Sequence, residues 1–168
     1  LDIGHGSKAD YFLLLNDDIE MQPGAIAEMI AVCRAEPMSI VAPLQINYRR
    51  PDEIDGAMRE LLAATPELMD ELLLKGEPRR YYHQRTLIGA ALLATLDTWR
   101  TIGDFDPAFS FYGPDDDYSN RAQDMGIPRL AAIRAHMLHM HGKTEASPKV
   151  SKKDWLRRWS TQYQARAI

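Results

Sequence analysis

The sequence feature that most constrains the fold is a short apolar run that ends abruptly in acidic residues. Tyr11–Leu15 reads YFLLL, and Asn16, Asp17 and Asp18 follow directly. A continuous apolar run of this length suits a strand that is buried on both faces, as in a parallel sheet. The two adjacent acids repel each other, so a cation or solvent has to compensate their charge. The segment is therefore either a cation site or a solvated turn, for which Asn and Asp are common residues.

Strand and helix patterns alternate along the rest of the chain. Pro23 suits the first turn of a helix whose apolar residues recur at helical spacing until Glu36. Further patterns predict strands at 39–42, 129–134 and 137–140, an apolar stretch at 87–95, helices at 57–75, 97–102 and 118–125, and loops at 43–57 and 103–117. This alternation indicates an α/β layered fold. We expect one domain at 1–150 and a basic amphipathic helix at 151–168.

The composition narrows the classes of function. The chain has 168 residues, a net charge of -4 and 45% apolar residues, which suits one domain with a substantial core. Its negative charge argues against nucleic-acid binding through phosphate contacts. The single cysteine, Cys33, rules out an internal disulfide framework, and its apolar neighbours predict a core residue. The longest uncharged apolar run is about half of what a membrane span needs. We expect a cytoplasmic protein, either free or peripheral at the inner membrane face through its basic tail.

Three clusters of polar side chains stand at the ends of predicted elements. They are Asn16-Asp17-Asp18, Asp115-Asp116-Asp117 and the histidines His136, His139 and His141. Carboxylates and an imidazole together suit Mn²⁺ or Mg²⁺, and ligands of open α/β sheets bind beyond the carboxyl ends of the strands. Repulsion within 115–117 raises the pKa of at least one acid, which favours a general base near neutral pH. The same acids would also suit a helix N-terminus, where the helix dipole favours negative charge.

Taken in order, these clusters resemble those of the family 2 glycosyltransferases, which have the GT-A fold. DYFLLLNDDIEMQPGAI is similar to that family's strand ending in a DXD-type motif, followed by a proline-glycine helix start. IGAALLATLDTWRTIGDFDPAFSFYGPDDDYSNRAQDMGI resembles its acceptor-side segment, and HMLHMHGKT resembles its terminal histidine motif. The resemblance covers residues 9–144. It implies a GT-A-like (Rossmann-like) mixed sheet flanked by helices.

The resemblance also implies an activity, the metal-dependent inverting transfer of a sugar from a nucleotide-sugar donor to an acceptor hydroxyl. Asp18 would be a ligand of Mn²⁺ or Mg²⁺, and the further ligand would be His139, or His141 in an alternative local alignment. Asp115 would be the catalytic base. The acceptor would be a saccharide or a lipid-linked molecule, as in polysaccharide biosynthesis. The residues that would bind substrate are Asn16, Asp17, Gly89, Asp116, Asp117 and Arg121.

Two departures from the family pattern bear on this expectation. Pro114 stands where the family usually has a glutamate, and the family's N-terminal nucleotide-binding half has no counterpart before residue 16. We therefore expect a shortened GT-A fold in which the outer edge of Tyr11–Leu15 is exposed and invites a homodimer. The alternative function is a non-catalytic GT-A-like binding or assembly domain. A metal-dependent phosphohydrolase is a third candidate, but the sequence has no P-loop, nucleophile elbow or His-x-x-x-His helix to support it.

Overall fold

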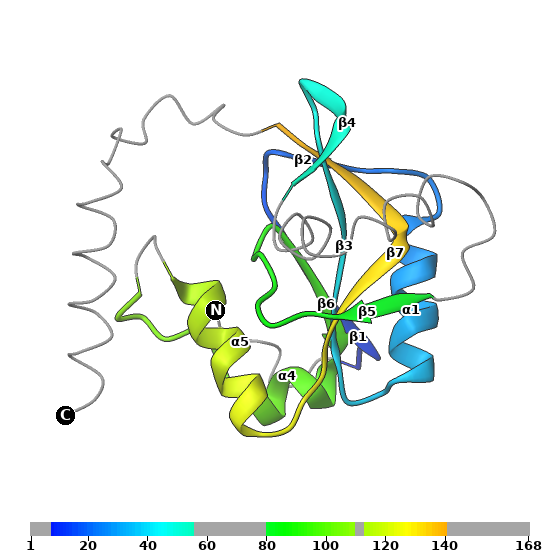
Figure 1. Cartoon of the computed structure of the whole chain (residues 1–168). Coiled ribbons are helices and arrows are strands. Elements are labelled where there is room, and N and C mark those ends of the chain that lie inside the picture. The colour runs from blue at the N-terminus through cyan, green and yellow to red at the C-terminus, as the bar shows by residue number, and fades with distance from the viewer. Residues whose placement is uncertain (1–7, 56–79, 110–112, 141–168) are drawn as a thin grey trace.

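One mixed β-sheet with helices on both faces organises the chain, as a computed structural model shows for residues 8–55, 80–109 and 113–140 (Figure 1). Its strands are β1 (Tyr11–Leu15), β2 (Ile19–Met21), β3 (Ile40–Asn47), β4 (Arg50–Asp55), β5 (Tyr81–His83), β6 (Ala91–Thr95) and β7 (Arg129–His139). The helices are α1 (Ala25–Ala35), α4 (Leu96–Ile102) and α5 (Pro114–Asp124). The expected mixed α/β architecture is thereby confirmed.

The two long strands β3 and β7 hold the sheet together. The strand order is β1-β6-β3-β7-β2, with β4 paired to β3 and β5 paired to β7. Strands β3 and β7 run parallel, but their register shifts between Pro43 and Leu44, whose partners are Ala132 and His136. Proline has no N–H to donate, so a break in the ladder is a place where a strand tolerates it. Before the break β5 pairs with β7, and beyond it β2 does.

Each face of the sheet is covered by its own apolar cluster. Helix α1 packs Met29, Val32 and Cys33 against residues of β3, β6 and β7. Helices α4 and α5 pack Trp99 and Tyr118 against the other face, and Figure 1 shows these two helices on the side of the sheet away from α1. Cys33 is 1% exposed, and burial raises the pKa of its thiol to about 12. The prediction that Cys33 is a core residue is confirmed.

Trp99 joins β1 to α4 and α5. Its indole Nε1 donates to the Phe12 carbonyl (3.0 Å), and its ring meets the Phe12 ring edge to face at 5.2 Å. The Trp99 ring also lies 4.9 Å from that of Tyr118, which stacks on Phe105 at 4.6 Å. This aromatic group packs α5 and β1 together, and acids accumulate next to both elements.

Strand β1 has the predicted bounds but not the predicted environment. It pairs antiparallel with β6, and its side chains are half-buried or exposed. The expectation of a parallel strand buried on both faces is wrong, because β1 lies at an edge of the described sheet and pairs there with β6 alone. Pairing of this edge with a second copy stays a prediction.

The segment 43–57 was expected to be a loop, and this expectation is wrong. Strand β3 continues to Asn47, and β4 folds back on it as a hairpin. Prolines gave the segment a loop-like composition, yet Pro43 sits at the ladder break and Pro51 lies in a strand that pairs on one side within the described sheet. The two strands expected at 129–134 and 137–140 are one strand, β7, bent at the same break.

Both long helices begin at different residues than expected. Helix α1 starts at Ala25, after a left-handed Gly24 (φ 84°) that follows Pro23. Helix α5 starts at Pro114 rather than Tyr118, with Gly113 (φ 83°) before it and all three acids of 115–117 in its first turn. The interpretation of these acids as a helix N-terminus is therefore confirmed. The helix expected at 57–75 and the tail expected at 151–168 both lie wholly outside the described residues.

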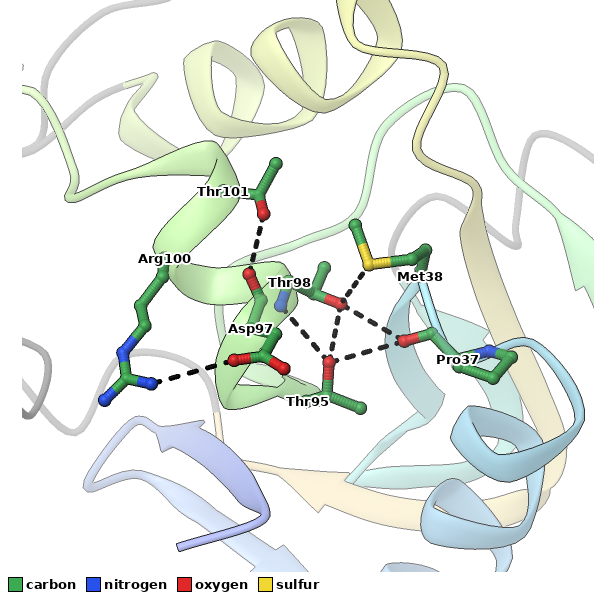
Figure 2. A network of polar contacts seen from close by, with 7 residues as sticks. All are labelled: Pro37, Met38, Thr95, Asp97, Thr98, Arg100 and Thr101. Carbon is green, nitrogen blue, oxygen red and sulfur yellow. Dashed lines mark hydrogen bonds and ion pairs between the residues drawn. The ribbon is translucent and has the colours of Figure 1, made fainter. Parts of the chain in front are cut away.

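A polar network fastens the start of α4 to the turn between α1 and β3 (Figure 2). Thr95 caps the helix by accepting a hydrogen bond from the Thr98 N–H (3.2 Å). The Thr98 hydroxyl lies 2.8 Å from that of Thr95 and donates to the Pro37 carbonyl (3.2 Å). Because Thr98 is fully buried, its hydroxyl has no access to water as an alternative partner.

In the described part of the chain, no helix combines the length and the apolar character needed to cross a bilayer.

We predict that Thr98→Val lowers the free energy of unfolding by about 1–2 kcal/mol, because a valine of the same shape leaves buried hydrogen-bonding groups without their partner. Thr101 is the matched control, since its hydroxyl bonds the Asp97 carbonyl (2.8 Å) on the exposed side of the same helix. Thr101→Val should stay within about 0.5 kcal/mol of wild type. Urea unfolding monitored by Trp fluorescence measures both. Equal effects of the two substitutions would contradict this account of the network.

Candidate active site

Asp18 and His139 form a polar pair where β2 meets the end of β7. Asp18 immediately precedes β2, whose first residue, Ile19, lies opposite His139. The Asp18 Oδ1 atom is 3.3 Å from His139 Nε2, and the two side chains are 17% and 10% exposed. The backbone closes the same contact, because the Met140 N–H donates to the Asp18 carbonyl (2.9 Å). Two residues that are distant in sequence thus present a carboxylate oxygen and an imidazole nitrogen to each other.

The geometry of this pair fits two neighbouring ligands of a divalent cation. In an octahedral site with ligands at about 2.1 Å, adjacent donor atoms lie about 3.0 Å apart. The observed 3.3 Å is close to that separation. Among the described residues, no group of three His, Cys, Asp or Glu side chains is arranged to hold a metal. The described side chains would therefore supply two ligands, and phosphate oxygens and water would supply the rest.

The other histidines of the cluster are not in this pair. His136 is exposed, and its Nε2 lies 3.0 Å from the Ile133 carbonyl. Alternation along a strand turns neighbouring residues to opposite faces, so an odd separation takes His136 away from His139. The alternative ligand His141 lies outside the described residues.

The two adjacent acids of the opening motif have different surroundings. Asp17 is exposed in the turn between β1 and β2, whereas Asp18 is half-buried against His139. Asn16 is exposed, and its N–H donates to the Ala90 carbonyl (2.9 Å). Asp17 therefore fits the solvated turn that the sequence allowed. Asp18 does not, because its carboxylate faces the His139 imidazole. The roles of Asn16 and Asp17 in binding substrate stay predictions.

Asp115 is held at the start of α5 by two backbone N–H groups. Its Oδ2 accepts from Gly89 (3.1 Å), and its Oδ1 accepts from Asp116 (3.1 Å). The approach to Gly89 is close, because a Cβ at that position would lie 3.2 Å from the Asp115 Cβ. A glycine at 89 thus lets the carboxylate reach the backbone. The family resemblance implied that Gly89 belongs to the site, but only the fold shows its contact with Asp115.

The two polar groups border one small apolar cluster, which we call the site floor. It consists of Ala90, Ala91 and Met137, with Ile19, Met21 and Ile88 packed against it. Asp18 directly precedes Ile19, and His139 follows Met137 by two positions on β7. Gly89, which binds Asp115, directly precedes Ala90. The Asp18–His139 pair and the Asp115 carboxylate are therefore attached to neighbours of the same buried cluster.

The three acids at 115–117 also divide into different states. Burial raises the pKa of Asp116, the negative charge of Asp115 raises it further, and Arg85 lowers it. This confirms the expectation that repulsion raises the pKa of at least one of these acids. Asp117 instead is 2% exposed and pairs with Arg121, whose Nε lies 2.9 Å from Asp117 Oδ2.

Arg121 also fixes the loop that follows α4. Its two terminal nitrogens donate to the carbonyls of Ile102 (2.6 Å) and Asp104 (2.8 Å), and its guanidinium lies 5.0 Å from the centre of the Tyr118 ring. The predicted pairing of Arg121 with Asp117 across one helical turn is confirmed. These contacts make both residues supports of α5, and their contribution to substrate binding stays a prediction.

Comparison with known proteins finds a similar fold but no similar sequence. No protein-family model matches the chain, and no curated protein matches it in sequence. Its fold is similar to that of the glycosyltransferase GalNAc-T7 in a crystal structure with UDP, GalNAc and Mn²⁺, with a TM-score of 0.65 and 12% sequence identity. The match covers 96% of this chain and 34% of that chain. At this identity the similarity concerns the fold alone.

We predict opposite effects when the neighbouring acids Asp116 and Asp117 are replaced by asparagine. Asp117→Asn should lower the free energy of unfolding by about 3 kcal/mol, because it leaves the Arg121 charge without its buried partner. Asp116→Asn should leave the free energy of unfolding unchanged or raise it. A raised pKa means that ionising this carboxyl costs more free energy in the folded state than in the unfolded chain, and asparagine avoids that cost.

The raised pKa of Asp116 also makes the stability of the protein depend on pH. A raised folded-state pKa means that the folded protein holds this proton to higher pH than the unfolded chain does. Stability contributed by the protonated group is therefore lost as pH rises from about 4, the unfolded value, through the folded pKa. Urea midpoints of wild type and Asp116→Asn should coincide below this window and diverge above it in favour of the variant. Divergence in the opposite direction would refute the assignment.

Proposed function

We propose that this chain is the catalytic part of a metal-dependent inverting glycosyltransferase with a GT-A-like fold. The observation that carries the proposal is the contact of Asp18 with His139 beside the site floor, next to which Gly89 binds Asp115. The similarity of the fold to a glycosyltransferase structure supports the same class. A nucleotide-sugar would be the donor, and a saccharide or lipid-linked hydroxyl would be the acceptor.

On the donor side, Asp18 and His139 would hold Mn²⁺ or Mg²⁺ through the two atoms that face each other. The bound cation would neutralise the charge that develops on the departing diphosphate. For His139 to serve, its Nε2 must be unprotonated, which requires any ring proton to sit on Nδ1. Asn16 and Asp17, in the exposed turn before Asp18, would flank the nucleotide. UDP is the first nucleotide to test, because the GalNAc-T7 crystal structure contains it.

On the acceptor side, Asp115 would act as the general base. The acceptor oxygen forms a bond to the anomeric carbon while the bond from that carbon to the diphosphate oxygen breaks, and the hydroxyl proton passes to the Asp115 carboxylate. The N–H groups of Gly89 and Asp116 fix the orientation of that carboxylate. Attack opposite to the leaving group inverts the anomeric centre. Asp117 and Arg121 would maintain the position of the helix that carries the base.

We predict that Asp18→Ala weakens the Mn²⁺-dependent binding of UDP by at least about 10-fold. Even mutation of a residue that only supports a metal ligand typically weakens metal binding by about that factor. Glu20→Ala is the matched control and should retain binding, since Glu20 is an exposed acid two positions further on that has no role in this scheme. Calorimetric titrations with UDP, GDP and dTDP, with and without Mn²⁺, measure this. Wild-type protein that binds no nucleotide, or binds equally well without metal, would contradict the proposal and favour a non-catalytic module.

We predict that Asp115→Asn lowers turnover by about 10²- to 10⁴-fold, the usual cost of losing a general base. The affinity for the nucleotide-sugar should change little, because Asp115 would act on the acceptor. Asp124→Asn, at the exposed far end of the same helix, is the control and should retain most of the activity. Release of nucleoside diphosphate in the presence of a saccharide acceptor provides the assay. Unchanged turnover in Asp115→Asn would exclude this residue as the base.

A further inference from the structure

Gln45 of β3 is a buried polar side chain that the scheme above does not use. It is 5% exposed, and its Oε1 atom has no hydrogen-bond partner in the described part of the molecule. Buried side-chain oxygens in folded proteins are generally bonded, because water is lost on burial and must be replaced. An oxygen left open in this way calls for a ligand or for another specific explanation.

The strand register places Gln45 on the same face of the sheet as His139. Gln45 lies opposite Met137 of β7, and Asn47 lies opposite His139 in the same parallel pair. Residues directly opposite each other share a face, and residues two apart on one strand also share a face. Met137 in turn lies opposite Met21 of β2. Gln45 thus lies next to β7, which carries His139, and two strands from β2, which Asp18 precedes.

The site floor also connects Gln45 with the Asp115 half of the site. Met137, its direct neighbour, is a member of the floor together with Ala90 and Ala91. Val41 of β3 pairs antiparallel with Leu93 of β6, so β3 continues from there toward the segment that precedes Ala91. That segment contains Gly89, the residue that binds Asp115. Gln45 therefore lies on the strand between β7, which carries His139, and β6, which Gly89 precedes by two positions.

The open atom defines the chemistry of the group it would bind. A carboxamide oxygen is neutral and only accepts, so its partner is an O–H or N–H donor. In the proposed reaction, the group that lies between the cation and the base is the sugar that is transferred, and its hydroxyls are such donors. A buried acceptor rejects an analogue that lacks the matching hydroxyl, because the acceptor would then stay unpaired.

We propose that Gln45 is a specificity-determining residue whose Oε1 accepts a hydrogen bond from a hydroxyl of the transferred sugar. This inference rests on the glycosyltransferase function proposed above. The oxygen is unsatisfied while the site is empty and becomes paired when the sugar binds. The residue would therefore lower the stability of the ligand-free protein and increase its affinity for the sugar.

The test compares Gln45→Met with Gln84→Met. Methionine has the length of glutamine without the acceptor. Gln84 is the matched control, because it is 8% exposed but its Nε2 donates to the His83 carbonyl (3.0 Å). The melting temperature of the ligand-free protein should stay level or rise in Gln45→Met and fall in Gln84→Met. In calorimetry with Mn²⁺, Gln45→Met should bind UDP like wild type but lose about 10-fold or more of its affinity for the UDP-sugar that wild type prefers.

Failure of this inference is distinguishable from failure of the proposed function. Wild type that binds UDP with Mn²⁺ but prefers none of UDP-glucose, UDP-galactose, UDP-GlcNAc and UDP-GalNAc over UDP would overturn the role of Gln45 and leave the nucleotide site standing. A Gln45→Met protein that melts as early as Gln84→Met, with its sugar preference intact, would overturn it too and make Gln45 a structural residue. Wild type that binds no nucleotide would remove both proposals.

Discussion

The parallel pairing of β3 with β7 is the contact on which the rest of the arrangement depends. It joins the first third of the chain to a strand that begins at residue 129. It places Gln45 beside Met137 of the site floor. On its other edge β7 pairs with β2, which brings His139 to Asp18. Strand β7 pairs with β5 before the register shift at Pro43 and with β2 beyond it.

The fold separates like charges by giving each acid a different environment. Of the pair at 17 and 18, one remains in solvent and the other faces an imidazole. Of the three at 115–117, the first accepts two backbone N–H groups, the second carries a raised pKa, and the third is neutralised by Arg121. Adjacent acids in sequence thus need not compete, because a turn and a helix point their side chains in different directions. The chain can then hold one acid against an imidazole, another on two backbone N–H groups and a third in a structural ion pair.

The sequence predicts those elements whose signals are local. The bounds of β1 follow from an apolar run between polar residues, and α4 ends at Gly103 as its glycine indicates. The hairpin of β3 and β4 is missed, because its pairing depends on a partner strand and its prolines resemble those of a loop. The contact of Asp18 with His139 was expected from family resemblance, since spacing alone says nothing about proximity. Gln45 carries no sequence signal, because only burial distinguishes it from a glutamine that faces solvent.

The position of β7 in the sheet has a consequence for the order of events during translation. Among the described elements β7 is made last, yet it lies between β3 and β2. Strand β2 has only three residues, and β7 is its sole partner in the described sheet, so it gains its ladder only after residue 139 leaves the ribosome. Until then the edge of β3 is open, which is the condition under which nascent chains associate wrongly. A chaperone that shields this edge would therefore act on an intermediate in which Asp18 and His139 are not yet in contact.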